Sequence, residues 1–330
     1  MMTANLNFVL YACCIPTKGA KRSIVCDLQR NSFIYIPNGL FELFENNVSL
    51  LVTKLDNSIR EILDYLVENE YGFYTNEIDK FPLLNKGYES DIPNEISSLI
   101  IDFNSKSDLD LEIIAKNIND IRLYAIEIRC FDSLSNRNII DLIQKMDLPL
   151  IRTLHLFLKH TAKLTDDFLA EIITSSDSIK QIIIHSAPFD KVKPKYFGTS
   201  IIYSTEAIKD ETHCGNIAPN YFESNLPQFK NRKVNNCLHG KISIDSKGFI
   251  KNCPSMSNNF GHISRVTLLE ALSNIEYKKY WYIAKSEISV CKDCEFRYIC
   301  LDCRVYRTDD SILSKPKKCS YDPYTNSWQK

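Results

Sequence analysis

The segment AIEIRC at residues 125–130, with three segments that resemble it, decides the fold class of this chain. Each is a short run rich in β-branched and other apolar residues, which predicts a buried strand. The other three are RTLHLFLKH (152–160), QIIIHSAP (181–188) and SIIYST (200–205). Amphipathic stretches at 138–146 and 166–173 predict helices between the first three strands. This alternation predicts right-handed crossovers and a parallel sheet, forming either an incomplete (β/α) barrel or an open doubly wound sheet.

The N-terminal part follows a different pattern. Two helical stretches, at 40–45 and 57–69, follow three extended segments, which are FVLYACCIP (8–16), RSIVCDLQ (22–29) and SFIYIPN (32–38). Ser58 with Glu61 resembles a capping box at the start of the second helix. Strands followed by helices predict a small α+β, winged-helix-like module. We therefore expect an α/β protein with this module at 1–85, an incomplete barrel-like domain at 86–210 and a cysteine-rich domain at 211–330.

Composition argues against several classes of protein. The 330 residues include 40 Lys and Arg against 41 Asp and Glu, so the net charge is close to zero. The chain as a whole is therefore not expected to attract nucleic acid or an anionic membrane. The sequence has no apolar run of about eighteen residues, so we expect no membrane span. The N-terminal stretch MMTANLNFVLYACC lacks the basic region and long apolar region of a secretory signal, which predicts a cytoplasmic protein. Glycine-rich nucleotide-binding motifs are absent as well.

Polar residues at the ends of the predicted strands are candidates for catalysis, because ligands bind at the carboxyl ends of parallel strands. They are Cys130, Asp132, His160 and His185. A histidine at such a position is more often a hydrogen-bonded structural residue than a catalytic base. Neither G-x-S-x-G nor H-E-x-x-H is present, so the sequence assigns no catalytic residue and leaves open whether the chain is an enzyme.

Seven of the twelve cysteines have the spacing of a metal-holding framework. Its core is C-x2-C-x5-C-x2-C from Cys291 to Cys303, and a hairpin-like stretch, KISIDSKGFIKN, separates two further members, Cys237 and Cys253. Close pairs on tight turns direct several thiolates to one point, and distant cysteines such as Cys319 then complete the ligand set of the same metal site. A disulfide scaffold is the alternative, but it is typical of small secreted domains. Four other cysteines in apolar, strand-like contexts are predicted to be small buried residues: Cys13, Cys14, Cys26 and Cys130.

The C-terminal cysteines, with Gly248 between Cys237 and Cys253, closely resemble the SPASM domain, the auxiliary iron-sulfur module of radical SAM peptide-modifying enzymes. One gap differs, because Cys300 and Cys303 enclose two residues where that family usually has three. Four segments more specifically resemble the SPASM-domain peptide maturases of grasp-with-spasm systems, which are encoded beside an ATP-grasp ligase and a small precursor peptide. These segments are HCGNIAPNYF (213–222), KNCPSMSNNFGHI (251–263), CKDCEFRYICLDCRVY (291–306) and CSYDPYTNSW (319–328).

The resemblance implies two 4Fe-4S clusters in the C-terminal domain. The ligands that it implies are Cys291, Cys294, Cys300 and Cys319 for one cluster, and Cys237, Cys253 and Cys303 for the other. The second set lacks one ligand, for which we favour Cys214 over His213 or His239, and a substrate group or water is a further alternative. Zinc is the alternative metal, because the spacing of C-x2-C pairs does not separate zinc from iron-sulfur.

A motif for a cluster that binds S-adenosylmethionine is missing. Such a cluster needs C-x-x-x-C-x-x-C, and no two cysteines in the chain are four residues apart. At the corresponding positions after Cys130 stand Leu134 and Arg137, which do not ligate iron. We therefore expect no S-adenosylmethionine cluster and no adenosyl radical, and the maturases that the chain resembles lack this motif too.

The resemblance implies a non-radical maturation protein for a ribosomally made peptide, which would bind the precursor peptide and the ATP-grasp ligase. Two alternatives are an iron-sulfur oxidoreductase that modifies the precursor itself and a zinc-stabilised adaptor. We expect the N-terminal module to capture the leader of the precursor by adding it as a strand to a sheet edge. Residues such as Phe33, Tyr35, Leu63 and Leu66 would line its pockets, with filling of the module's own core as the alternative for each.

Overall fold

The computed structural model describes residues 6–81 and 95–329. The chain divides into two compact units, each assembled from separate segments of the sequence. Unit 1 comprises Met1–Asp91, Gly215–Asn236 and Ile283–Lys330, and unit 2 comprises Ile92–Cys214 and Cys237–Tyr282. The expected boundary between residues 85 and 86 lies outside the described residues. Residues 211–330, which we expected to form one domain, contribute to both units.

Unit 2 is built on an eight-stranded, mostly parallel sheet, which confirms the predicted α/β class. The strand order is β11-β12-β10-β9-β8-β7-β13-β14, and only the edge strands β11 and β14 run antiparallel to their neighbours. The strands are β7 (Ser98–Phe103), β8 (Ala125–Cys130), β9 (Thr153–Lys159), β10 (Ile179–His185), β11 (Lys191–Val192), β12 (Ser200–Tyr203), β13 (Lys241–Ile244) and β14 (Ile250–Lys251). The four predicted strands are present, and so is the hairpin expected between Cys237 and Cys253.

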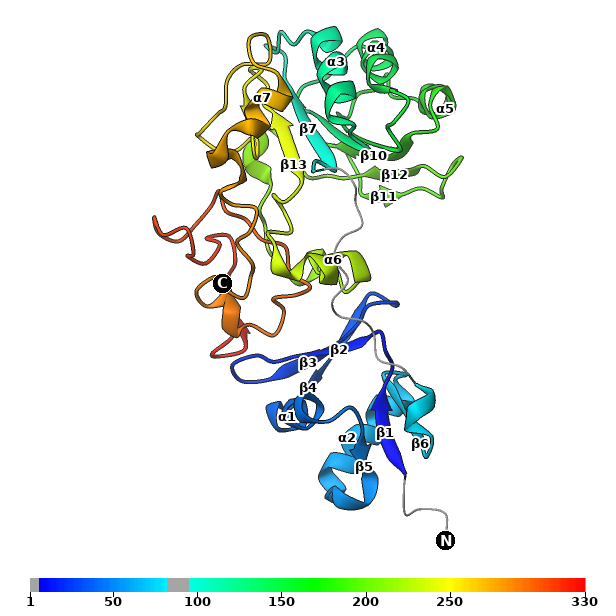
Figure 1. Cartoon of the computed structure of the whole chain (residues 1–330). Helices are drawn as coiled ribbons and strands as arrows, with labels where there is room; N and C mark the ends of the chain where they lie inside the picture. Colours follow the sequence, from blue (N-terminus) through cyan, green and yellow to red (C-terminus); the bar gives the residue numbers. More distant parts are fainter. Residues whose placement is uncertain (1–5, 82–94, 330) are drawn as a thin grey trace. The chain divides into compact units, whose positions relative to one another are not determined.

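Consecutive strands from β7 to β10, and then β12, are neighbours in the sheet. The order then changes direction once, because β13 follows β12 in the chain but lies on the other side of β7 and parallel to it. Because crossovers of one hand place successive helices on the same face, the order explains why α3, α4 and α5 cover one side of the sheet (Figure 1). The helices of unit 2 are α3 (Leu111–Ile121), α4 (Asn136–Met146), α5 (Asp166–Ser175) and α7 (Leu268–Ser273).

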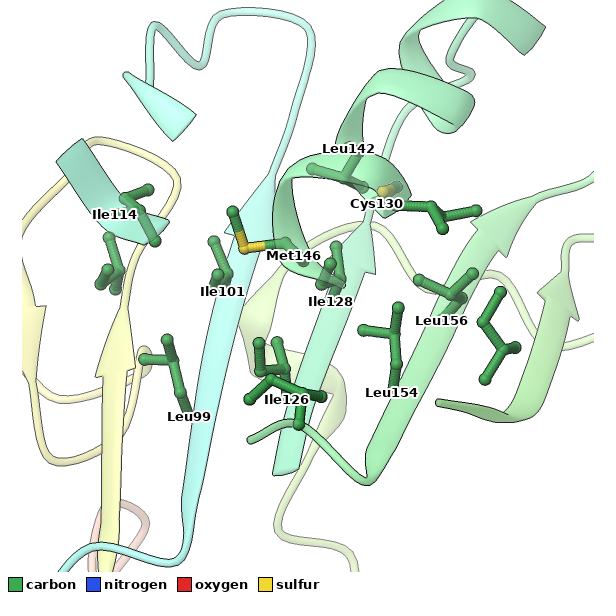
Figure 2. Close-up of a cluster of buried hydrophobic side chains, with 14 of the residues drawn as sticks. Leu99, Ile101, Ile114, Ile126, Ile128, Cys130, Leu142, Met146, Leu154 and Leu156 are labelled. Atoms are coloured by element: carbon green, nitrogen blue, oxygen red, sulfur yellow. The ribbon is translucent and has the colours of Figure 1, made fainter. Parts of the chain in front are cut away.

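The helix-covered face of the sheet holds the main hydrophobic core. Alternate residues of each strand point into it, and Ile128, Leu154 and Leu156 are fully buried there. Figure 2 shows these side chains meeting Leu142 and Met146 of α4. Each helix begins at a side chain that accepts a hydrogen bond from the first turn. These caps are Asp110, Ser135, Thr165 and Thr267.

The opposite face of the sheet carries charged side chains among apolar ones such as Ile100. Arg129 of β8 and Asp102 of β7 are almost completely buried and form a two-pronged ion pair, with Nε to Oδ1 at 2.6 Å and Nη2 to Oδ2 at 2.8 Å. Glu127 and His155 lie side by side in the next row of the ladder and are partly buried. The alternation of apolar and polar residues therefore separates a packing face from a face that carries charge.

Unit 1 begins with a small sheet of order β5-β1-β6 and two helices. Its elements are β1 (Asn7–Leu10), β5 (Leu50–Leu51), β6 (Gly72–Thr75), α1 (Asn38–Asn46) and α2 (Asn57–Glu68). Phe8, Leu63 and Leu66 are fully buried between them. The predicted capping box at Ser58 and Glu61 is wrong. Asp56, two residues earlier, is the cap and accepts from the amide of Ile59 at 2.9 Å.

The extended segment expected at residues 8–16 is two strands in different sheets, because a turn closed by a bond from the Cys14 amide to the Tyr11 carbonyl separates them. The second strand starts an antiparallel sheet, β2 (Cys14–Thr17), β3 (Ser23–Asp27) and β4 (Ser32–Ile36). This sheet packs on segments from the C-terminal part of the chain through Ile24, Phe296 and Ile299. The regular elements there are short: α6 (Leu226–Lys230), β15 (Tyr321–Asp322) and β16 (Ser327–Trp328).

The longest described helix, α2, has 12 residues, whereas a helix needs about 20 apolar residues to cross a bilayer. Within residues 6–81 and 95–329, every helix is therefore too short or too polar to do so.

Candidate functional site

Four cysteines of the C-terminal segment are neighbours within unit 1. Cys291 and Cys300 are buried, and Cys294 and Cys319 are partly buried. The pKa of Cys300 is raised to about 12, mainly by burial and also by the negative charges of Cys319 and Cys291, while Lys285 opposes this shift. Burial likewise raises the pKa of Cys294, with contributions from the charges of Glu295, Cys300 and Cys291. These four thiols are therefore close enough to influence one another electrostatically, and a shared metal site stays a prediction.

Short turns and single hydrogen bonds position these thiols. A 3-10 turn at Cys291–Asp293 ends with the Cys294 amide donating to the Cys291 carbonyl at 3.1 Å. The Cys300 amide donates to the Phe296 carbonyl at 2.9 Å. Because regular ladders are scarce here, the path of the chain depends on such individual contacts.

A buried polar network fixes the middle of this segment. Glu295 is fully buried, and its Oε1 accepts from Arg22 Nε at 2.8 Å and from the Tyr321 hydroxyl at 2.5 Å. Phe296, the next residue, packs against Tyr321 and against Phe33 of β4, with ring centroids 5.1 and 5.5 Å apart. The hairpin of the N-terminal part therefore supports the loop that carries the cysteines.

A buried cation lies beside the thiols. Lys285 is only 5% exposed, and its Nζ is 3.8 Å from Cys300 Sγ and 3.5 Å from Asp302 Oδ1. Asp302 also accepts from Arg304 Nη2 at 2.7 Å and from Asn235 Nδ2 at 2.6 Å. A buried ammonium next to several thiols stabilises them as thiolates, which is the form that binds metal. Burial lowers the pKa of Lys285, but the charges of Cys300 and Asp302 outweigh that effect and raise it.

Three further cysteines group within unit 2. The pKa of Cys253 is raised to about 12, mainly by burial and also by the charges of Cys237 and Cys214. Arg129 Nη1 donates to Cys214 Sγ at 3.2 Å. The charges of Cys237, Glu127 and Cys253 raise the pKa of Lys241 against the effect of its burial. Cys214, our candidate for the missing ligand, therefore belongs to the same neighbourhood as Cys237 and Cys253.

Cys303, the remaining predicted ligand of that set, lies in unit 1 and is buried. It packs against Gly215, whose φ is +83° and where an added Cβ would lie 2.8 Å from Cys303 Sγ. Any larger residue at 215 would press on this thiol and also strain the backbone. Whether Cys303 joins the thiols of unit 2 stays a prediction.

The histidine alternatives for the missing ligand have other neighbours. His213 Nδ1 is 2.9 Å from the carbonyl oxygen of Asp210. His239 packs against Trp281 and Tyr282, with ring centroids 5.5 and 5.8 Å away. Burial lowers the pKa of both histidines, which keeps their rings neutral at pH 7.

The strand-end candidates have mainly structural surroundings. His185 is fully buried, its Nε2 donates to the carbonyl oxygen of Cys130 at 3.0 Å, and its Nδ1 is 3.1 Å from the Ser186 hydroxyl. Cys130 lies in the hydrophobic core, and burial raises its pKa to about 12. Asp132 accepts from the amide of Ser105 at 2.7 Å, which lowers its pKa, and the amide of His160 donates to the His185 carbonyl at 2.9 Å.

One candidate metal-binding group was missed in the sequence. Cys14, Cys26 and Cys130 are buried, as expected, but Cys13 is only half-buried. The thiols of Cys13 and Cys14 and a carboxylate oxygen of Asp27 all lie within 4.8 Å of one another. The adjacent cysteines were a visible signal, but the carboxylate comes from the neighbouring strand, and its register is not local information.

The chain is therefore rich in cysteine, carries a candidate metal-binding group and is compatible with a metal cofactor. All twelve cysteines have free thiols in the structure. No protein-family model and no curated protein matches the sequence.

Proposed function

We propose that the chain is a maturation protein for a ribosomally made peptide, that it carries two 4Fe-4S clusters, and that it acts with an ATP-grasp ligase on the precursor. The observation that carries the proposal is the group of Cys291, Cys294, Cys300 and Cys319, with Lys285 buried beside it. Cysteine thiolates hold iron-sulfur clusters, and nearby charge tunes their potentials. The resemblance of the cysteine segments to SPASM maturases supplies the class of substrate and partner.

Three protein residues would hold the second cluster in unit 2, namely Cys214, Cys237 and Cys253. Their grouping supports Cys214 as the ligand that the resemblance did not supply. Arg129 and Lys241 lie beside them, and their positive charges would balance those of thiolates. Cys303 stays part of this proposal on the resemblance alone.

Zinc stays the alternative metal for the C-terminal thiols. Cysteine thiolates bind zinc as well as iron-sulfur clusters, and the spacing of C-x2-C pairs does not separate the two. The resemblance to the SPASM domain favours iron.

Anaerobic purification followed by metal analysis tests the proposal. Two clusters would give about eight iron and eight sulfide per chain, with a broad thiolate-to-iron absorption in the visible range. Stoichiometric zinc without iron would instead establish the adaptor alternative. In the same preparation, reduced protein with S-adenosylmethionine should release no 5′-deoxyadenosine above a protein-free control.

We place the proposed leader site in the N-terminal module, beside one edge of its sheet. Strand β6 pairs with all four residues of β1 along one edge, whereas β5 pairs only with Asn7 and Phe8 on the other edge. On the β5 side, Val9 and Leu10 of β1 have no partner strand among the described residues. A cavity of about 220 Å³ is lined by Leu10, Tyr11 and Val48 among others. A peptide strand added here would form main-chain hydrogen bonds and place alternate side chains in the cavity.

This location replaces part of the predicted pocket. Leu63 and Leu66 are fully buried in the core of the module, so the expectation that they line a peptide pocket is wrong. Phe33 and Tyr35 take part in the aromatic contacts around Phe296. Leader-peptide binding measured by fluorescence anisotropy should therefore weaken in Leu10→Asp and stay unchanged in Tyr65→Asp, an exposed position on α2. Equal affinity in both variants would exclude the cavity as the site.

The oxidoreductase alternative differs in what the chain does without its partner. A maturation protein that serves the ligase gives modified precursor only when both proteins and ATP are present. Modification of the precursor by this chain and a reductant alone would support the oxidoreductase instead.

A further inference from the structure

The hairpin of β2 and β3 carries metal-ligating side chains that lie outside both cysteine groups described above. The Cys13 thiol, the Cys14 thiol and a carboxylate oxygen of Asp27 are within 4.8 Å of one another. Cys14 and Asp27 are 3% and 2% exposed, so two of the three groups are shielded from water. Two sulfur donors and one oxygen donor at this separation suit a borderline divalent ion. We propose that Cys13, Cys14 and Asp27 bind one zinc ion.

The backbone explains why these side chains converge. Adjacent residues of a continuous strand point to opposite faces. The turn closed by the Cys14 amide and the Tyr11 carbonyl, at 2.8 Å, places Cys13 before the strand rather than within it, so its side chain is freed from that alternation. Cys14 and Asp27 are direct partners in the antiparallel ladder, where opposed Cβ atoms lie about 4.5–5.5 Å apart.

Hydrogen bonds hold the Asp27 carboxylate in position. Oδ1 accepts from the amides of Gln29 at 2.8 Å and Arg30 at 3.0 Å, and Oδ2 accepts from Arg30 Nε at 2.5 Å. Carboxylates that ligate metals have such outer partners, which fix their orientation. The same carboxylate would therefore be held in place while one of its oxygens binds the ion.

Charge balance favours a divalent cation at this place. Zinc would displace both thiol protons to solvent and bind the two thiolates. The two thiolates and the Asp27 carboxylate carry three negative charges, which the zinc ion and the partly exposed Arg30, in an ion pair with Asp27, balance.

A fourth ligand is available from the neighbouring cavity. Cys14 lines the cavity of about 220 Å³ together with Leu10, Ala12 and Pro16. Water in that cavity completes a tetrahedral set around zinc. Three protein ligands with one water is the arrangement of open zinc sites, in contrast to closed four-cysteine sites.

Site-resolved alkylation of the full-length protein tests the proposal independently of the C-terminal cysteines. Metal-free, reduced protein is treated with iodoacetamide before and after addition of zinc, and each thiol is followed by peptide mass spectrometry. We expect zinc to slow alkylation of Cys13 and Cys14 by about tenfold or more, because a metal-bound thiolate is a poor nucleophile. Cys26, buried in the same hairpin but outside the group, is the internal reference and should not change.

Two variants complete the test. Cys13→Ser removes one ligand from a half-buried position and should abolish the protection of Cys14 by zinc, whereas Cys26→Ala should leave that protection intact. Asp27→Asn should weaken the protection of both thiols. Protection of Cys14 that persists in Cys13→Ser would overturn the proposal. Equal slowing of Cys26 in the wild type would also overturn it, because that result would mean general stabilisation rather than ligation.

Discussion

The parallel sheet of unit 2 and the cysteine-bearing segment of unit 1 are ordered by different means. In the sheet, β8 and β9 pair along their length, and Ile128, Leu154 and Leu156 are fully buried against helices. Beyond residue 283 the only strands in the described chain are β15 and β16, with two residues each. That segment relies on individual side chains such as Arg304, which is 1% exposed and donates to the carbonyls of Ile312 and Ser314.

The difference lies in how the stabilising free energy is distributed. A hydrophobic core spreads it over many residues, so that each one contributes a few kcal/mol at most. A ligand-held loop concentrates it in a few thiols and polar contacts, because metal binding and local folding are the same event. Single substitutions should therefore have larger local effects in the cysteine segment than in the sheet.

The largest effect is expected for Cys294→Ala. Loss of one ligand should remove the C-terminal cluster, lowering the iron content by about four per chain, since the remaining thiols cannot complete the set. Because structural metal binding contributes on the order of 10 kcal/mol to small thiolate-rich folds, the segment 283–329 should become sensitive to protease. Limited proteolysis with peptide mapping measures this, and the strands β7 to β10 should stay resistant.

Cys130→Ala is the matched control in unit 2. Its thiol is even more deeply buried than that of Cys294 but lies in the hydrophobic core, so its removal should cost about 1 kcal/mol of stability and leave the metal content unchanged. Wild-type iron and protease resistance in Cys294→Ala would show that this cysteine is no ligand.

A smaller effect is expected for Leu156→Ala in the sheet. Removing this fully buried side chain should lower the free energy of unfolding of unit 2 by about 2–5 kcal/mol. The chain has two tryptophans, Trp281 in unit 2 and Trp328 in unit 1, so urea unfolding in a Trp328→Phe background reports on unit 2. Iron content should be the same as in the parent, and a loss of iron here would remove the proposed contrast between the regions.

The same contrast decides how much could be predicted from the sequence. The segment AIEIRC is strand β8 with the predicted bounds, because its β-branched residues Ile126 and Ile128 recur at the spacing of one strand face and are therefore visible in the sequence. Strand β7 was missed although it contains Leu99 and Ile101. A charged residue such as Asp102 is unexpected in a buried strand, and the sequence does not show that Arg129 of the next strand neutralises it.

The candidate site was predictable only as far as local spacing reaches. The pairs of close cysteines from Cys291 to Cys303 are visible in the sequence because only two residues separate the members of each pair, and Cys291 and Cys294 lie on one 3-10 turn. Contacts made across strands were not visible, such as Cys14 with Asp27 or Arg22 with Glu295. They depend on register and on chain segments hundreds of residues apart, which a local pattern does not encode.

The smallest effect is expected from pH, and it should again separate the two regions. All six histidines lie in unit 2 and none in unit 1. Burial lowers the pKa of His185, whose two ring nitrogens are satisfied in the neutral form by Cys130 and Ser186. As pH falls below about 6.5, the unfolded chain binds a proton at this residue and the native chain does not, so the free energy of unfolding falls by at most about 1.4 kcal/mol per pH unit.

The measurement compares wild type with His185→Gln, because Asp102 titrates in the same range. Burial raises the pKa of Asp102 to about 6 against the opposing charge of Arg129, and protonation of that group in the native state has the opposite effect on stability. This contribution is common to both proteins and cancels in the difference. Between pH 7.5 and 5.5, the wild type should lose about 1 kcal/mol more than the variant, measured by urea unfolding through Trp281 in the Trp328→Phe background. Parallel pH profiles of the two proteins would mean that His185 is charged in the native state. The unfolding of unit 1, followed through Trp328 in a Trp281→Phe background, should show no histidine-dependent step over this range.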